Sequence, residues 1–367
     1  MKPTEDNPLL YRITLTLLFC VLTVVCLYYA KGILIPVTTA ALLSMLLLPM
    51  VRRFEQWKMG RFLSIFCSLL VVVAVIGMLI YILSAQVISF SADIPTIQQN
   101  LNQKFQVLQS WIQTKTGLTA EQQLIYLQKA ASSFLGVAQS LATMIVAATT
   151  GTIVFVGLLL VLIFLFLYYR HRIYHFLLSI VPKDNNINTE KIISEISMVT
   201  QKYLLGVFTV MGILSVLNSL VFLMIGVPHA VFFGILASIL NVVPYIGVWV
   251  GTLLPMIMMA ITQPSLTPIL LIVLGVWINQ QIDNNFLTPT ITGSRVAINP
   301  LATIIILIIG GYIWGVAGMV LFIPLLGVAK IVFDNVEGLK PLGYLIGDDS
   351  TGSQSSMKRW FTKLRKK

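Results

Sequence analysis

Charged residues are scarce in this chain. Only 10% of its 367 residues are Asp, Glu, Lys or Arg, whereas 57% are hydrophobic, and the mean hydropathy is +0.91. One soluble core cannot bury apolar runs of this length and number, so the composition excludes a soluble globular protein. The runs are continuous rather than alternating, which favours helices over a β-barrel, because a helix satisfies its own backbone hydrogen bonds in lipid. We therefore expect an all-α, polytopic membrane protein.

Histidine and cysteine are also rare, with three of each. The cysteines lie inside apolar runs without metal-ligand spacing and are interpreted as small hydrophobic residues. His171 and His175 are four positions apart, as two ligands on one helix face would be, but Arg170 and Arg172 flank His171 and would oppose a cation. The H-E-x-x-H, G-K-[ST] and G-x-S-x-G motifs are missing. We expect no metal, no cofactor and no enzymatic activity, and an ATP-driven pump is excluded for this chain alone.

Apolar runs of about 20 residues, the length that a bilayer requires, predict where the chain crosses the membrane. About six full spans are expected, near residues 10–30, 32–51, 61–85, 148–170, 203–226 and 266–282. Basic residues cluster in the linker VRRFEQWKMGR and again between Arg170 and Lys202. The positive-inside rule places both of these segments, and with them the N-terminus, in the cytoplasm.

Residues 86–147, between the third and fourth spans, contain eleven glutamines and only five charged residues. Apolar residues recur at helical spacing after Pro95, and Thr119 with Gln122 matches a capping box. This pattern predicts two amphipathic helices outside the membrane, on the extracytoplasmic side. They either lie on the outer leaflet or against a neighbouring subunit, or they serve as a spacer.

Residues 229–262 and 299–334 are each too long for one helix and too short for two full spans, and glycines interrupt both near the middle. The interruptions read PYIGVWVG and GGYIWGVAG. Each contains a G-x-x-x-G and is followed by a proline. We expect two re-entrant hairpins, with hinge residues at Pro244, Gly247, Gly251, Gly311, Gly315 and Gly318.

The number of spans predicts that the two hairpins enter the membrane from opposite sides. The C-terminal segment MKRWFTKLRKK has six basic residues and no acidic one, as expected of a cytoplasmic segment attracted to anionic lipid at about 1 kcal/mol per basic residue. Broken hairpins of opposite entry are typical of secondary transporters, where unwound backbone faces the cargo. Residues 1–85 would form N-terminal transmembrane helices, 86–147 an extracytoplasmic helical segment, 148–341 the core transport region and 342–367 a basic tail.

A polar island, QQIDNNFLTPTITGSRVAINP at residues 280–300, lies between two apolar runs. Asp283 ends the last full span, and an acidic group that faces a cavity at a membrane boundary binds a cation or a proton. The alternative is a solvated carboxylate or a partner of Arg295. Asn218 lies in mid-span, where interhelical hydrogen bonding is the alternative to cargo binding, and Asn241 precedes the first hairpin break. These four residues are candidates for binding substrate or coupling ion.

The segments NVVPYIGVWVG, DNNFLTPTITGSRVAINPLATI and GGYIWGVAGMVLFIPLLGVAKIVFD resemble signature blocks of the autoinducer-2 exporter (AI-2E) family of bacterial inner-membrane permeases. The similarity covers nearly the whole chain in span layout. It implies that Asp283, Asn285 and Pro289 match the family's acidic residue, asparagine and proline, and Asn285 is therefore a fifth candidate for binding substrate or coupling ion. It also implies that Gly293 matches the family's glycine and Pro300 its later proline. These three residues, Pro289, Gly293 and Pro300, are expected to be hinges, and the two prolines are expected to keep the chain between them from becoming helix.

The resemblance implies efflux of small molecules, with signalling molecules and cation/proton exchange both proposed for members. The chain departs from the family at Thr290, where many members have a basic residue, and at Asn299, where they often have histidine. We expect an ion-coupled efflux permease of the bacterial inner membrane, with both termini cytoplasmic. We also expect a homo-oligomer that binds a small molecule or ion and anionic lipid at the basic tail, but no nucleic acid. The alternatives are a cation/proton antiporter, an intramembrane enzyme, and an oligomeric channel or lipid-interacting scaffold.

Overall fold

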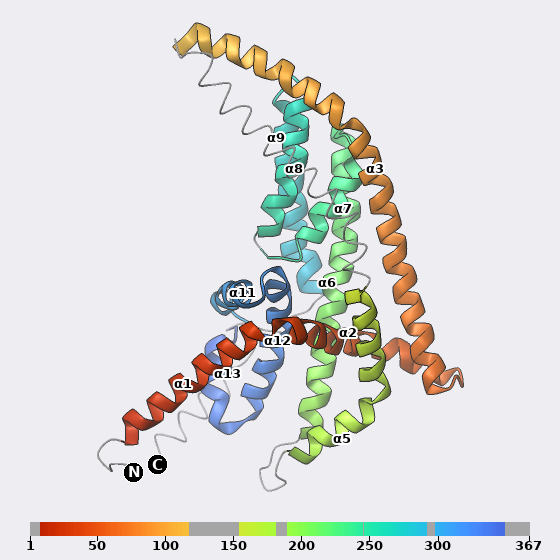
Figure 1. The fold of residues 1–367 in the computed structure, drawn as a ribbon, viewed down its shortest axis with the longest axis vertical. Coiled ribbons are helices and arrows are strands. Elements are labelled where there is room, and N and C mark those ends of the chain that lie inside the picture. The colour runs from red at the N-terminus through yellow and green to blue at the C-terminus, as the bar shows by residue number, and fades with distance from the viewer. Residues whose placement is uncertain (1–7, 117–153, 181–188, 245, 292–297, 349–367) are drawn as a thin grey trace. The chain divides into compact units, whose positions relative to one another are not determined.

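The described part of the chain is helical, which confirms the all-α prediction. A computed structural model describes residues 8–116, 154–180, 189–244, 246–291 and 298–348 (Figure 1). Within these ranges, backbone pairing of the β type is limited to an isolated bridge between Ile298 and Gly347.

Five helices in the described ranges are long and apolar enough to cross a membrane, or six if a bent pair counts as one span. The pair joins the helix Val154–Tyr168 to the following one, α5 (Arg170–Ile180), at an angle of 63° and matches the fourth predicted span. Four other helices coincide with predicted spans, namely α1 (Pro8–Tyr29), α2 (Lys31–Gln56), the first part of α3 (Arg61–Thr116) and α6 (Thr189–Ile225).

The sixth predicted span coincides with α9 (Thr267–Ile282), whose 16 residues are fewer than the ~20 of a full span. By contrast α12 (Val316–Asn335), in the second predicted hairpin, has 20 residues and is long enough to cross a membrane alone. The segment after the third span differs from the prediction, because α3 continues through Pro95 as one helix of 56 residues. The proline removes one backbone donor, but this cost is local, and the helical periodicity of the next residues lets the helix resume. The second amphipathic helix predicted from Thr119 lies outside the described residues.

Contacts divide the chain into two compact units, each made of several segments. Unit 1 comprises Met1–Ile65, Leu158–Tyr203 and Ser294–Lys367, and unit 2 comprises Phe66–Gly157 and Leu204–Gly293. The boundary falls within the polar island, so that Asp283 belongs to unit 2 and Asn299 to unit 1.

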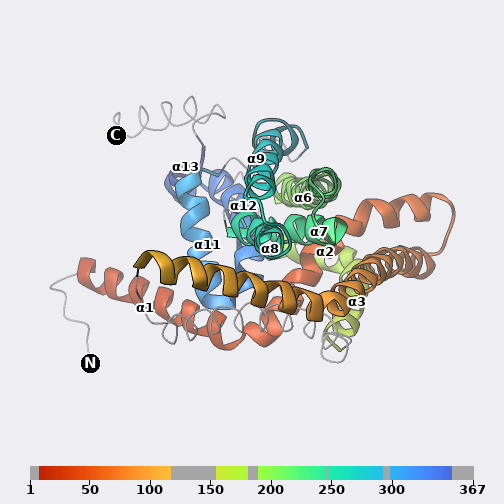
Figure 2. The same cartoon turned by 90° about the horizontal axis from the view of Figure 1, so that it is seen from above.

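In unit 1, α11 (Pro300–Trp314) and α12 form a pair of helices side by side (Figure 2). Gly315 separates them with a φ of +63°, where an L side chain is strained. Gly310 and Gly318 face each other across the pair, since a Cβ on either would overlap the backbone of the other. The helix break predicted near Gly315 is therefore confirmed. After α12 come η2 (Glu337–Leu339) and α13 (Lys340–Ile346).

Side chains in unit 1 satisfy backbone carbonyls that interrupted helices leave without partners. The Trp314 Nε1–H donates to the Leu27 carbonyl at 3.0 Å, in the last turn of α1. Pro49, inside α2, has no N–H for the Met45 carbonyl, and the Gln201 Nε2–H donates to that carbonyl instead at 3.0 Å. These bonds stabilise α1 and α2 where their own backbone bonding is incomplete.

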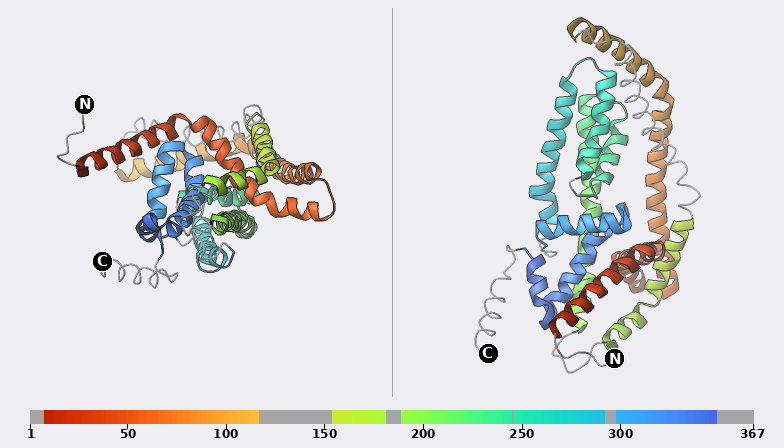
Figure 3. Two further views of the ribbon diagram at one scale, coloured as in Figure 1. Left: turned by 90° about the horizontal axis from the view of Figure 1, so that it is seen from below. Right: turned by 60° about the vertical axis from the view of Figure 1, so that its left-hand side comes forward.

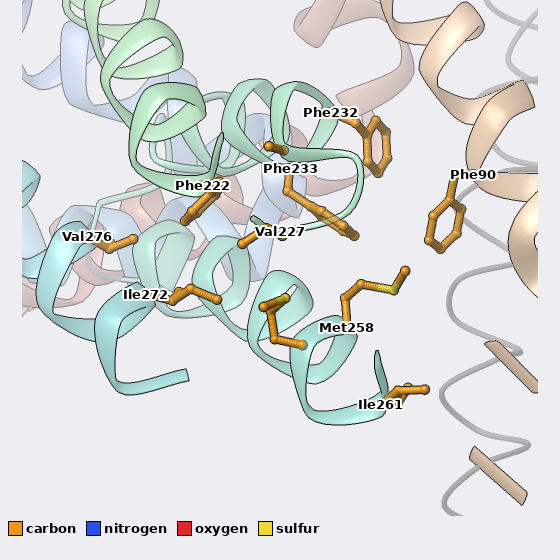
Figure 4. Packing of buried hydrophobic residues seen from close by; sticks show 11 residues of the cluster. Phe90, Phe222, Val227, Phe232, Phe233, Met258, Ile261, Ile272 and Val276 are labelled. Carbon is orange, nitrogen blue, oxygen red and sulfur yellow. The ribbon is translucent and has the colours of Figure 1, made fainter. Parts of the chain in front are cut away.

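Unit 2 surrounds a hydrophobic cluster in which Phe90 of α3 faces Phe232 and Phe233 (Figure 4), with ring centroids 6.0 and 6.1 Å apart. His229, just before α7 (Ala230–Leu240), has a left-handed φ of +55°, and its Nε2 lies 3.0 Å from Asp93 Oδ2 of α3. The cluster therefore joins α3 to the helices that carry the site. Its members are Phe90, Phe222, Val227, Ala230, Phe232, Phe233, Met258, Met259, Ile261, Ile272 and Val276.

The first predicted hairpin is a pair of helices in unit 2, α7 and α8 (Ile246–Thr262), and α8 and α9 lie side by side (Figures 1 and 3). The chain between α7 and α8 breaks helical structure around Pro244, as predicted. A Cβ on Gly247 would overlap the Leu240 carbonyl, and a Cβ on Gly251 would lie 2.7 Å from the Ala237 Cα. Glycine is therefore required for the close approach of these two helices.

Candidate functional site

The helix before the polar island continues past Asp283. A π-helical turn, η1 (Asp283–Leu287), follows α9 and leads into α10 (Thr288–Ile291), so the chain is helical as far as Ile291. The Thr288 N–H donates to the Asp283 carbonyl, which is the i to i−5 bond of a π turn. Pro289 lies within α10, so the prediction that it prevents helix formation is wrong as far as Ile291, and residues 292–297 lie outside the described residues. The wider π turn gives a proline ring room beside the preceding carbonyls, which an ordinary α turn does not.

Asp283 is a buried carboxylate, with a relative exposure of 5%. Its Oδ1 accepts a hydrogen bond from the Thr288 hydroxyl at 2.7 Å, and its Oδ2 accepts a longer one from the Asn241 Nδ2 at 3.5 Å. Among the residues that the structure describes, no Lys, Arg or His lies within ion-pair distance of this carboxylate. A carboxylate so placed is costly as an anion unless a proton or cation neutralises it.

A chain of buried polar side chains links three helices beside Asp283. The Asn279 Nδ2 of α9 donates to the Asn218 Oδ1 of α6 at 2.8 Å, and the Asn218 Nδ2 donates to the Ser238 Oγ of α7 at 3.1 Å. Ser238 in turn donates to the Gly234 carbonyl at 2.8 Å. These bonds fix the orientation of the Asn218 amide, because its oxygen and its nitrogen have different partners.

A cavity of about 10 Å³, the size of one water molecule, lies within unit 2. The amides of Asn218, Asn241, Asn279 and Gln280 line it together with the Thr252 hydroxyl. Its apolar walls are Leu214, Ala237, Val248 and Val276. The cavity therefore offers neutral donors and acceptors, and Asn241 connects it to the Asp283 carboxylate.

Asn285, predicted as a site residue, is exposed, and its Nδ2 donates to the Gln281 carbonyl at 2.8 Å and to the Gln281 Oε1 at 3.2 Å. A side-chain bond to the carbonyl four residues earlier is common where helical bonding is disturbed, as it is in the π turn. Asn285 thus supports the turn through its bonds to Gln281. Gly293 and Arg295 lie outside the described residues.

In unit 1, Asn299 caps α11 and joins it to the end of α13. Its Oδ1 accepts from the Ala302 N–H at 2.7 Å, and its Nδ2 donates to the carbonyls of Leu345 at 2.7 Å and Gly347 at 3.2 Å. The Asn299 N–H donates to the Ile346 carbonyl at 2.9 Å. Pro300 then occupies the first position of α11, where a missing N–H costs nothing.

The structure thus brings together three of the predicted site residues, Asp283, Asn218 and Asn241. Sequence reasoning missed Ser238, Thr252 and Thr288, and it assigned no role to Asn279 and Gln280. A signal for Asn279 was present, because it lies four residues before Asp283 and so shares its helix face. The contact of Thr288 with Asp283 had no such signal, since it depends on the π turn.

Comparisons with known proteins agree with this architecture. A family model described as AI-2E family transporter matches residues 17–338. YueF of Bacillus subtilis, a candidate transport protein by name, is 26% identical over 320 residues, covering 83% of this chain and 84% of YueF. The AI-2 transport protein TqsA of Escherichia coli is 23% identical over 324 residues, covering 87% of this chain and 91% of TqsA. The chain is a multi-pass membrane protein of a transporter family and not an enzyme; it belongs to the AI-2E transporter family.

Proposed function

We propose that the chain is a secondary permease that couples efflux of a small molecule or ion to movement of a cation or proton, and that Asp283 binds the coupling ion. The observation that carries this proposal is the burial of the Asp283 carboxylate, 5% exposed, with the neutral side chains of Thr288 and Asn241 as its hydrogen-bond partners. A proton or cation would remove the electrostatic cost of that burial. Its arrival and departure would therefore favour different arrangements of the surrounding helices.

The amide-lined cavity is the proposed place for cargo. Asn218 and Asn279 hold each other in position, and Asn241 both lines the cavity and contacts Asp283. A volume of about 10 Å³ excludes anything much larger than water, so a molecular cargo requires the helices around the cavity to separate. Such a closed form is one state of an alternating-access cycle.

The helical pairs α7–α8 and α11–α12 are proposed to be re-entrant hairpins that enter the inner membrane from opposite sides. Three of their helices support this, because α7, α8 and α11 have 11, 17 and 15 residues, fewer than the ~20 of a full span. Both termini are then cytoplasmic, and the basic tail contacts anionic lipid. The protein is further proposed to work as a homo-oligomer.

Cation/proton antiport is a second candidate function, and the size of the cavity favours it. Space for one water molecule suits a small ion better than an organic solute. An oligomeric channel or lipid-interacting scaffold is the alternative of another class, and it requires no role for Asp283.

The test is flux in proteoliposomes with an imposed proton or sodium gradient, for the unmodified chain and for Asp283→Asn. This change removes the charge and keeps the shape. We expect flux that is lost or no longer driven by the gradient, with normal membrane insertion and assembly. Asp93→Asn is the matched control, since Asp93 is the other carboxylate in the described part of unit 2 and its side chain is 56% exposed.

Wild-type flux in Asp283→Asn, with unchanged pH and sodium dependence, would overturn the coupling role. The site would then have to be sought at Asn218 and Asn241. Flux through the unmodified chain that does not depend on the gradient would instead indicate a channel. Absence of flux would support a scaffold.

A further inference from the structure

The π turn brings Thr288 and Asp283 together. Side chains five residues apart lie about 140° apart around an α-helix, so they face different directions. In a π turn the i to i−5 bond places them one above the other, and here the Thr288 N–H makes that bond to the Asp283 carbonyl. The Thr288 hydroxyl can then donate to the Asp283 Oδ1 at 2.7 Å. An unbroken α-helix through this segment would separate the two side chains.

The bond from Thr288 decides which way the carboxylate points. With Oδ1 held by the Thr288 hydroxyl, Oδ2 is directed to the Asn241 Nδ2, 3.5 Å away. Asn241 directly follows α7, at the break before α8, and it also lines the amide cavity. The carboxylate is thus oriented between its own π turn and the break in the helical pair. The 2.7 Å bond is the shorter of the two, so Thr288 is the main determinant of this orientation.

We propose that Thr288 is a positioning residue for transport: its hydroxyl, brought opposite Asp283 by the π turn, covers Oδ1 and directs Oδ2 to Asn241 and the cavity. This rests on the proposed role of Asp283 as the coupling-ion site. Thr288 itself touches no cargo. It is an exposed residue whose hydroxyl reaches a buried carboxylate, so it stands between Asp283 and the surroundings of α10.

The role predicts how accessible the carboxylate is to a chemical reagent, independently of transport. The probe is dicyclohexylcarbodiimide, a hydrophobic reagent for protonated carboxyl groups, applied to the purified full chain, with modification at Asp283 followed by mass spectrometry. Thr288→Val removes the hydroxyl at nearly constant volume. It removes the hydrogen bond to Oδ1 and uncovers that oxygen to the reagent.

We expect Thr288→Val to raise the labelling rate at Asp283 at least about fivefold, within the range for loss of one ordinary hydrogen bond. Thr288→Ser keeps a hydroxyl and should label like the unmodified chain. Thr290→Val, an exposed position on the same short helix, should also leave the rate unchanged. Labelling at Asp93 in the same sample reports any general loosening and should be constant. Equal labelling of Asp283 in Thr288→Val and the unmodified chain would overturn the proposal.

A second measurement connects the bond to transport. In proteoliposomes, Thr288→Val should raise the driving-ion concentration for half-maximal flux about fivefold, while the maximal flux stays within about twofold. A merely structural role would lower the maximal flux instead, and that result counts against positioning. If flux in the unmodified chain does not depend on a gradient, the proposed coupling fails, but the labelling experiment still decides whether Thr288 positions Asp283.

Discussion

Replacing Gly247 with alanine tests the close packing that holds the first helical pair together. The added Cβ would overlap the carbonyl group of Leu240 and come too close to the Cα of Asn241. All of these atoms belong to the backbone, so no side-chain rotation relieves the overlap, and α7 and α8 must move apart. Because Asn241 lines the cavity and contacts Asp283, the shift reaches the candidate site.

The expected magnitude follows from a comparison with Gly77 of α3. Overpacking one methyl group against fixed neighbours costs about 1–3 kcal/mol, which is the expected loss for Gly247→Ala. At Gly77 an added Cβ meets nothing within 4 Å. Gly77→Ala should therefore stabilise the helix by up to about 1 kcal/mol, through helix propensity alone. The two variants should differ by roughly 1–4 kcal/mol.

Thermal unfolding of the two variants in the same detergent measures this difference, and gradient-driven flux measures its functional effect. Gly247→Ala should unfold at a lower temperature than the unmodified chain and transport more slowly, whereas Gly77→Ala should do neither. Equal unfolding temperatures for the two variants would refute the reasoning, because Gly247 would then be an ordinary helix glycine.

Two further predictions concern other parts of the chain. Single cysteines placed within residues 86–147 should react with an impermeant maleimide in intact cells, whereas a cysteine at Lys367 should react only after permeabilisation; a C-terminus labelled in intact cells contradicts the hairpin topology. Asn299→Ala should lower the free energy of unfolding by about 1–2 kcal/mol, because it removes the cap of α11 and two bonds in which the side chain is the donor. The control Asn335→Ala removes one local bond to the Ile331 carbonyl and should lower the free energy of unfolding by less. Similar unfolding temperatures for these two variants would mean that the Asn299 contacts add nothing to stability.

Hydropathy and glycine placement were sufficient to predict most of the architecture. The first three spans, the first helix of the bent pair and α6 follow from apolar length, and the break at Gly315 follows from glycine-rich sequence. Gly315 illustrates why, because its positive φ is a conformation that other residues rarely adopt. The first break lies around Pro244, whereas Gly247 and Gly251 are inside α8. Lengths near the limit of a span were harder to assign, as α9 and α12 show.

Prolines misled the sequence analysis twice. Pro95 and Pro289 were both interpreted as limits of helical structure, but α3 continues through the first and α10 contains the second. Whether a proline ends a helix depends on whether the neighbouring turns can release a bond, and for Pro289 the π turn does so. No local sequence pattern predicts a π turn, so the contact of Thr288 with Asp283 could not be predicted from the sequence.

The polar residues of the candidate site could be predicted from the sequence, but the contacts between them could not. Asp283, Asn218 and Asn241 stood out as polar residues in apolar surroundings, and the structure places all three in unit 2. Arg295 was a candidate for the same reason, but it lies outside the described residues, and only its position in the sequence supports a role in the site. The hydrogen-bond chain through Asn279 depends on the packing of α6 against α9, and hydropathy does not predict which helices pack together.

The bonds of Asn299 have a consequence for the order in which the protein is made. Asn299 is synthesised 46 residues before Leu345, whose carbonyl accepts one of its side-chain N–H groups. The start of α11 therefore obtains its complete set of hydrogen bonds only when nearly the last described residues have left the ribosome. A chain released before residue 345 would retain every predicted span yet leave Asn299 without these acceptors. The hydrogen bonds at the start of α11 therefore depend on the synthesis of the short α13.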